Sequence, residues 1–368
     1  MKSLFPFDVL LFLQENGLFF LFLSLMKKEV KTAVVILNWN GRNFLENFLP
    51  SVLSNTSPDE AEIWVADNGS QDDSIAFLSR NYPRVKCLLL DRNYGFAGGY
   101  NRALRQIHAQ YYLLLNSDIE VTPGWLGPLV QVLDERKEVA AVMPKIKSYY
   151  QRHCFEYAGA AGGFIDRFGY PFCRGRIFYT VEEDRGQYDD ECSVFWATGA
   201  CMLIRSEAFH KAGGFDDMFF AHMEEIDLCW RLKNMGLLIR YTPRSVVYHV
   251  GGGTLNKDNP KKTYLNYRNN LYMLYKNLPR RHFFSKMLCR MMLDGISAIK
   301  HLLLFQGRYC MAILRAHGSF YLRLSELWRY RKNNASLLNY SSHPEMIKKS
   351  IIYHSFFLGK RTFTEIVK

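Results

Sequence analysis

Residues 33–115 contain four short, mainly apolar runs, and a helix-forming pattern follows each of the first three. Short, strongly apolar runs are typical of buried strands, and apolar residues at helical spacing are typical of helices packed on them. The runs lie at 33–37, 62–66, 85–90 and 111–115, and the helical patterns at 44–53, 73–80 and 100–109. Strands that alternate with helices favour right-handed crossovers. The sequence therefore predicts an α/β fold, a mostly parallel central sheet flanked by helices.

Each apolar run is followed by polar residues or glycines. The carboxyl ends of parallel strands share one edge of the sheet, where ligands bind in open α/β folds. We expect a nucleotide site at this edge, formed by Asn38, Asn40, Asp67, Asn68, Asn93, Gly98, Gly99 and Asp118. The chain has neither GxGxxG after its first strand nor GxxxxGK[ST], which argues against a dinucleotide dehydrogenase and a P-loop enzyme.

The triplet Asn116-Ser117-Asp118 directly follows the fourth run. Hard divalent cations prefer oxygen ligands, so Asp118 is well placed to hold such a cation against a phosphate. A plain turn is the alternative interpretation, because all three residue types favour turns.

Further along, residues 147–192 are rich in loops and too long for a passive connection, so we expect short strands or a mobile flap there. A helix is expected from about Glu224, with Glu224 and Glu225 at its positive end and Asp227 paired to Arg231. Ordinary helix-start acids are the alternative for the two glutamates. His249 ends a strand beside three glycines and is a candidate ligand.

The net charge of +12 indicates an anionic partner. From residue 279 to the end, sixteen Lys and Arg face four Asp and Glu among large apolar residues. This pattern predicts basic amphipathic helices suited to an anionic membrane surface, although a solvated helical tail packed on the preceding domain is the alternative. No nucleic-acid module is recognisable, so nucleic acid is not expected as a partner.

The chain divides into three parts: an apolar extension at 1–31, a central domain at 32–278 and a basic helical region at 279–368. Polar residues interrupt the first part, and neither half reaches the roughly 18–20 apolar residues that span a bilayer. We expect this extension to be dispensable, with a membrane-associating helix as the alternative.

Together, the motifs of the central domain resemble family 2 glycosyltransferases, most closely the bacterial rhamnosyltransferase branch. They lie at 34–41, 67–70, 93–101, 116–118, 198–200, 213–216, 224–231 and 249–254. The resemblance implies a GT-A fold for 32–278, a nucleotide-sugar donor, inversion at the anomeric carbon and a divalent metal, Mn²⁺ or Mg²⁺. A histidine ligand would suit Mn²⁺ better.

The resemblance also implies roles for individual residues. Asp118 and His249 would be metal ligands, and Glu225 would be the catalytic base, with Glu224 as the other candidate. Donor-binding residues would be Asn38, Asn40, Asp67, Asn93, Gly98, Asn101, Asn116 and Ser117, and acceptor-side residues Trp196, Thr198, Gly199 and Asp227. Asn116 replaces the first carboxylate of the family's Asp-x-Asp motif, and Glu225 replaces an aspartate.

The expected activity is transfer of rhamnose from dTDP-rhamnose to a lipid-linked glycan during cell-surface polysaccharide synthesis. The expected location is the cytoplasmic face of the membrane, where the protein would be peripheral. A UDP-hexose or UDP-galactofuranose transferase of the same fold is the near alternative. A non-catalytic module that binds nucleotide sugars or membrane surfaces is the alternative from another class.

Overall fold

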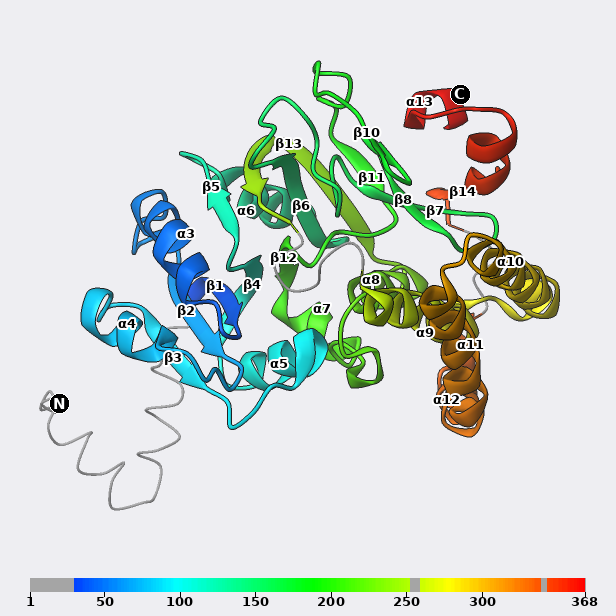
Figure 1. Ribbon diagram of the computed structural model, residues 1–368. Coiled ribbons are helices and arrows are strands. Elements are labelled where there is room, and N and C mark those ends of the chain that lie inside the picture. The colour runs from blue at the N-terminus through cyan, green and yellow to red at the C-terminus, as the bar shows by residue number, and fades with distance from the viewer. Residues whose placement is uncertain (1–29, 252–258, 339–342, 368) are drawn as a thin grey trace, which may run out of the picture.

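The computed structural model describes residues 30–251, 259–338 and 343–367. A large central sheet is flanked by helices, a small second sheet packs near it, and the helices of residues 260–333 form a group on one side, while the last helix lies beside the second sheet (Figure 1). The prediction for residues 1–31 falls almost wholly outside the described residues.

The large sheet has the strand order β11-β13-β6-β12-β4-β1-β2-β3, with β5 paired to β13. Strands β1, β2, β3 and β4 are mutually parallel where they pair, and β6 is parallel to β13. Strand β12 runs antiparallel between β4 and β6. The strands are β1 Val30–Asn38, β2 Glu62–Asp67, β3 Lys86–Leu89, β4 Ala109–Asn116, β5 Ile119–Val121, β6 Val139–Ser148, β11 Cys192–Val194, β12 Cys201–Arg205 and β13 Leu238–His249. The predicted mostly parallel sheet is confirmed.

The helices of this part are α3 Arg42–Ser54, α4 Ser74–Asn81, α5 Gly95–Leu104, α6 Leu126–Glu135, α7 Ser206–Lys211 and α8 Glu224–Asn234. Helix α5 begins five residues earlier than the sequence predicts, so Gly98 and Gly99 are buried inside it and do not form a loop. A Cβ atom on Gly99 would lie 2.9 Å from Leu37. Gly99 therefore lets α5 pack closely on β1.

The segment 147–192 contributes four short strands to a second sheet, as predicted. Its order is β10-β9-β8-β7-β14, formed by β7 Gly163–Asp166, β8 Pro171–Cys173, β9 Arg176–Ile177, β10 Thr180–Val181 and β14 Met346–Ile347. Strand β14 comes from the C-terminal region and pairs parallel with β7. Phe363 packs its ring 4.9 Å from that of Phe164, so the end of the chain also covers this sheet.

The C-terminal helices are α9 Pro260–Asn277, α10 Phe283–Leu303, α11 Gly307–Leu322, α12 Leu324–Asn333 and α13 Phe363–Val367. Turns of 3₁₀ helix lie at Asp217–Phe219, Arg280–His282 and Ala335–Leu338, and a π turn at Tyr353–Phe357. Helix α11 packs against both α9 and α10. Within the described ranges, we find no helix with the length and apolar content needed to cross a membrane.

Candidate active site

The carboxyl ends of β1, β2 and β3 come together at one edge of the sheet, as the sequence predicts. Asn38 and Asp67 are register partners, and the Asn38 Nδ2 donates to Asp67 Oδ1 at 2.9 Å. The Asn68 amide donates to Asn93 Oδ1 at 3.2 Å. Asn40 accepts a hydrogen bond from a backbone N–H of the loop after β2. This edge therefore presents amide and carboxylate groups from three consecutive strand ends.

Asp118 and His249 meet at the neighbouring strand ends. Strand β5 pairs antiparallel with β13 so that Ile119 lies opposite His249, which brings Asp118 beside the imidazole. The distance from Asp118 Oδ1 to His249 Nε2 is 3.1 Å, and both side chains are buried. The Asn116 amide nitrogen lies 3.4 Å from the same Nε2. The two predicted metal ligands are thus in contact, although 131 residues separate them in the chain.

Glu156 is a third member of this cluster, and no sequence motif points to it. Its Oε2 lies 3.4 Å from His249 Nδ1. Burial alone would lower the pKa of His249, but the charges of Glu156 and Asp118 outweigh burial and raise that pKa to about 10. In turn, His249 lowers the pKa of both carboxyl groups against the opposing effect of burial. Without a bound metal, this site therefore favours the charged form of the imidazole.

The donor set around Asp118 fits a divalent cation bound together with an anionic ligand. Asp118 offers a carboxylate oxygen, and His249 would offer an imidazole nitrogen once the metal displaces its proton, because only neutral imidazole binds a metal. Across the described part of the chain, no three His, Cys, Asp or Glu side chains are arranged to hold a metal by themselves. Oxygen atoms of a bound diphosphate or of water would have to complete the coordination.

Glu224 and Glu225 are the first two residues of α8, as predicted. Glu224 is buried and Glu225 half-buried, and Oε2 of each has no hydrogen-bond partner among the described residues. Burial raises the pKa of Glu225 to about 7, and it raises the pKa of Glu224 well above its ordinary value, with the Glu225 charge adding to the effect. Glu225 can therefore exchange a proton near neutral pH.

Cys173 on β8 links the two groups of acids. Burial raises the pKa of its thiol, and the negative charges of Glu156 and Glu225 both add to this shift. Both carboxylates must therefore lie within electrostatic reach of one sulfur atom. Because Glu156 also contacts His249, the Asp118 cluster and the start of α8 belong to the same region, beside the second sheet.

Comparison with known families identifies the chain. Residues 33–213 match the model described as glycosyl transferase family 2. Residues 33–213 form a family 2 glycosyltransferase domain. This confirms the resemblance of its motifs to that family.

Two curated relatives of this glycosyltransferase carry rhamnosyltransferase names. It is 28% identical over 240 residues to the N-acetylglucosaminyl-diphospho-decaprenol L-rhamnosyltransferase of Mycobacterium tuberculosis, covering 61% of this chain and 78% of the relative. It is 24% identical over 267 residues to rhamnosyltransferase WbbL of Escherichia coli K12, covering 70% and 96% respectively.

Solved structures show the fold. Staphylococcus aureus TarS 1–349 in complex with UDP-GlcNAc is 16% identical with a TM-score of 0.52, covering 90% of this glycosyltransferase and 93% of that chain. GalNAc-T7 with UDP, GalNAc and Mn²⁺ is 17% identical with a TM-score of 0.52, covering 67% of this chain and 48% of that one. The glycosyltransferase therefore has the predicted GT-A fold.

Several residues predicted to bind substrate make contacts within the glycosyltransferase's own framework. Asn101 donates to Phe215 O at 2.8 Å and to Asp217 Oδ1 at 2.7 Å, and its own Oδ1 accepts the Phe215 N–H, so its amide is fully used. Gly98 is buried in α5. Asn38 is completely buried and orients Asp67 from behind.

The acceptor-side residues are also buried. Trp196 donates its indole N–H to Phe164 O at 3.0 Å, and Thr198 and Gly199 are buried beside it. Asp227 is 0% exposed and pairs with Arg231 at 2.8 Å, which confirms the predicted ion pair, and with Lys276 at 3.0 Å. Asp227 therefore joins α8 to α9 and presents no free carboxylate to an acceptor.

The backbone before α8 is strained in a way that fixes the position of Glu225. Three residues other than glycine have left-handed φ angles, which are costly for L-residues: Phe220 (63°), His222 (71°) and Met223 (72°). The Asn269 amide of α9 donates to the carbonyls of Phe219, Ala221 and His222 at 3.0, 2.8 and 2.7 Å. We call residues 219–223 the base loop. Helix α9 holds this loop in its strained shape.

Asn269→Ala should lower kcat roughly tenfold or more, because small displacements of a catalytic group are costly in rate. The donor KM should change little, since the Asn269 amide donates to base-loop carbonyls and to no residue of the nucleotide edge. The matched control is Asn270→Ala on the same helix, whose amide donates to Gly169 O at 3.0 Å. Steady-state kinetics should be measured for both variants. If Asn270→Ala loses as much kcat as Asn269→Ala, Asn269 has no special role in positioning the base loop.

Proposed function

We propose that this glycosyltransferase moves rhamnose from dTDP-rhamnose, with inversion, to a saccharide carried on a lipid diphosphate. The observation that carries the proposal is the buried pair of Asp118 and His249 at the strand ends, with the raised-pKa carboxyl of Glu225 in the same region. The names of the two rhamnosyltransferase relatives favour this donor, and the name of the mycobacterial one includes a lipid diphosphate.

In this proposal the strand ends bind the nucleotide sugar. Asp67, Asn40 and Asn93 face the nucleoside, and Asn116 and Ser117 lie beside the diphosphate. A Cβ atom on Gly41 would lie 3.6 Å from the Ser117 hydroxyl, so the turn after β1 and the triplet after β4 form one surface. Asp118 and His249 would hold Mn²⁺ or Mg²⁺, which would stabilise negative charge on the diphosphate leaving group.

Glu225 is the proposed general base. Its carboxylate accepts the proton of the acceptor hydroxyl while that oxygen attacks the anomeric carbon. The bond from the anomeric carbon to the diphosphate oxygen breaks as the new glycosidic bond forms on the opposite face, which inverts the configuration. A pKa near 7 makes Glu225 a stronger base than an ordinary carboxylate while leaving it largely ionised at slightly alkaline pH.

A donor panel tests the proposal. The purified full chain is incubated with a lipid-diphosphate N-acetylglucosamine and, separately, dTDP-rhamnose, UDP-galactofuranose or UDP-N-acetylglucosamine. We expect mass spectrometry to show addition of one deoxyhexose with dTDP-rhamnose, loss of this product with EDTA, and recovery with Mn²⁺. Preference for a UDP sugar would replace the donor assignment. If neither transfer nor hydrolysis occurs with any donor, the protein is better described as a non-catalytic binding module.

A further inference from the structure

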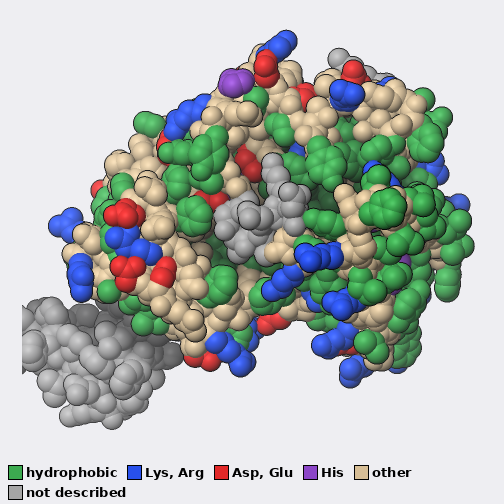
Figure 2. All heavy atoms as spheres, in the orientation of Figure 1, with side chains coloured by type: hydrophobic (Ala, Val, Ile, Leu, Met, Phe, Trp, Pro, Cys, Tyr) green, Lys and Arg blue, Asp and Glu red, His purple; other side chains and the backbone are tan. Residues whose placement is uncertain are grey.

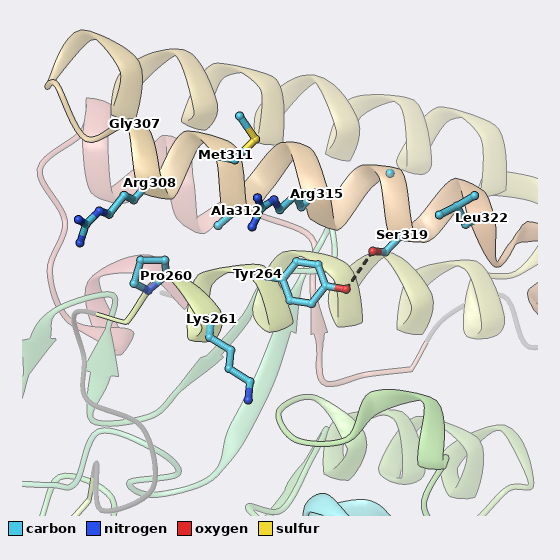
Figure 3. A pocket seen from close by; sticks show the side chains of 11 residues that line it. Pro260, Lys261, Tyr264, Gly307, Arg308, Met311, Ala312, Arg315, Ser319 and Leu322 are labelled. Atoms are coloured by element: carbon cyan, nitrogen blue, oxygen red, sulfur yellow. Dashed lines mark hydrogen bonds between the residues drawn. The ribbon is translucent and has the colours of Figure 1, made fainter.

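A groove of about 890 Å³ lies between α9 and α11. Tyr264 of α9 and Ser319 of α11 meet across it through their hydroxyl groups, 2.9 Å apart (Figure 3). Its walls combine apolar side chains, among them Met311 and Leu322, with three cations and no acid. The cations are Lys261, Arg308 and Arg315. Such a lining suits an amphiphile with an anionic head.

These cations have no counter-charge within the protein's described residues: none of them has a carboxylate at ion-pair distance. The wider surface is equally short of acids. Residues 283–322 contain five Lys and Arg but a single acid, Asp294, which is 0% exposed and paired with Arg290 at 2.8 Å. An anionic ligand would therefore meet no repulsion there.

One end of the groove adjoins the base loop. The Lys261 ammonium lies 5.7 Å from the centre of the Phe220 ring, and Phe220 is four residues before Glu224. In Figure 3 the Lys261 side chain points from α9 away from α11. A ligand in the groove would thus have its head near the start of α8.

The other side of α11 packs on α10, whose outer face is apolar and exposed. Its side chains recur at helical spacing and are 59–83% exposed: Phe284, Leu288, Met292, Ile296, Ile299 and Leu303. Phe305, in the turn after α10, is 99% exposed. Hydrophobic side chains gather on this side of the molecule in Figure 2. We call this set the α10 face; a lipid interface is the environment that suits such an apolar row among cations.

We propose that the α9–α11 groove binds the diphosphate and the first part of the lipid chain of the acceptor, while the α10 face lies in the membrane interface. Arg308 and Arg315 would pair with the phosphates, Lys261 would add positive charge at the end that adjoins the base loop, and the apolar wall would carry the chain toward the bilayer. The proposal rests on the proposed function and names where its acceptor binds. An anionic phospholipid headgroup has related chemistry, but the contact with the base loop favours the acceptor.

The test compares two double variants of the full chain that lose the same charge. Arg308→Ala with Arg315→Ala removes groove cations, whereas Arg329→Ala with Lys332→Ala removes exposed cations of α12. With acceptor in phosphatidylcholine vesicles, we expect the groove variant to raise the acceptor KM by about tenfold or more, while kcat and donor KM stay within twofold. The α12 variant should match the wild type. Equal behaviour of the two variants would overturn the proposal.

Direct binding separates this proposal from the proposed function. Farnesyl diphosphate should bind the wild-type chain in calorimetry and bind the groove variant at least about tenfold more weakly. If farnesyl diphosphate binds the wild type and the groove variant equally, the groove assignment is wrong even if sugar transfer is observed. If the groove variant loses this binding, the groove assignment is supported even if the proposed sugar donor is wrong. If the groove variant loses only its binding to phosphatidylglycerol vesicles, the site serves lipid headgroups and the acceptor assignment fails.

A further variant tests the membrane part. Leu303→Ser with Phe305→Ser should reduce flotation with vesicles severalfold while farnesyl diphosphate binding stays unchanged. If the wild-type chain instead forms a dimer in sedimentation that this variant abolishes, and vesicle flotation is unaffected, the α10 face is a contact between copies.

Discussion

Replacing Glu225 with glutamine lowers the rate of glycosyl transfer by about 10³-fold, because the acceptor hydroxyl loses the group that accepts its proton. The fold should survive. Burial raises the pKa of Glu225 from its ordinary value of 4.5 to about 7, so the charged form is disfavoured in the folded protein. A folded-state pKa above the unfolded one means that stability falls as pH rises from about 4.5 to 7. Glutamine removes this cost, and the melting temperature at pH 8 should not fall.

The pH dependence of kcat provides a second test of the Glu225→Gln variant. The wild-type kcat should rise with pH through about 7 and then level off, because only the ionised Glu225 can act as base. The residual rate of Glu225→Gln should lack that rise. Glu207→Gln, an exposed acid in the first turn of α7, is the matched control and should behave as wild type. Unchanged turnover in Glu225→Gln, with a large loss in Glu224→Gln, would make Glu224 the base.

Asp118→Asn should have an effect of similar size, a loss of about 10³-fold or ~4 kcal/mol of transition-state stabilisation. The amide keeps the shape of the side chain but removes the negative charge that would hold a divalent cation beside His249. Mn²⁺ titration of turnover should show a weaker apparent affinity, whereas binding of dTDP without metal should be unchanged.

The control for Asp118→Asn is Glu120→Gln, two residues along the chain, whose carboxylate pairs with the exposed Arg152 at 2.7 Å. An exposed ion pair contributes at most about 1 kcal/mol, so this control should keep both rate and stability. Full Mn²⁺-dependent turnover in Asp118→Asn would exclude Asp118 as a metal ligand.

The parts of this architecture that depend on local pattern were predictable. Strands at 33–37 and 111–115 are continuous apolar runs, and 62–66 is apolar after Glu62, because both faces of a parallel sheet are covered. Their polar ends converge because parallel strands end on one edge, so Asn38 and Asp67 could be placed together. The acids at the start of α8 followed from the helix period and the preference of carboxylates for helix N-termini.

Other features depend on contacts between distant segments, which a single sequence does not encode locally. The contact of Asp118 with His249 needs the β5–β13 pairing, and Glu156 reaches His249 from a segment without a motif. Asn101 and Asp227 match family motifs, and only the structure shows that both are buried and paired within the protein. The glycines at 98 and 99 suggested a loop because the packing of Gly99 against Leu37 depends on the folded structure.

The pairing of β14 with β7 has a consequence for engineering. The second sheet takes four strands from 163–181 and its edge strand from 346–347, and Lys233 at the end of α8 pairs with Glu345 at 3.0 Å. In a chimaera joined at residue 278, β7 and β14 would come from different proteins. A foreign sequence would then replace the edge strand of the second sheet. Domain shuffling among such transferases should therefore move 163–181 and 343–367 as a single unit.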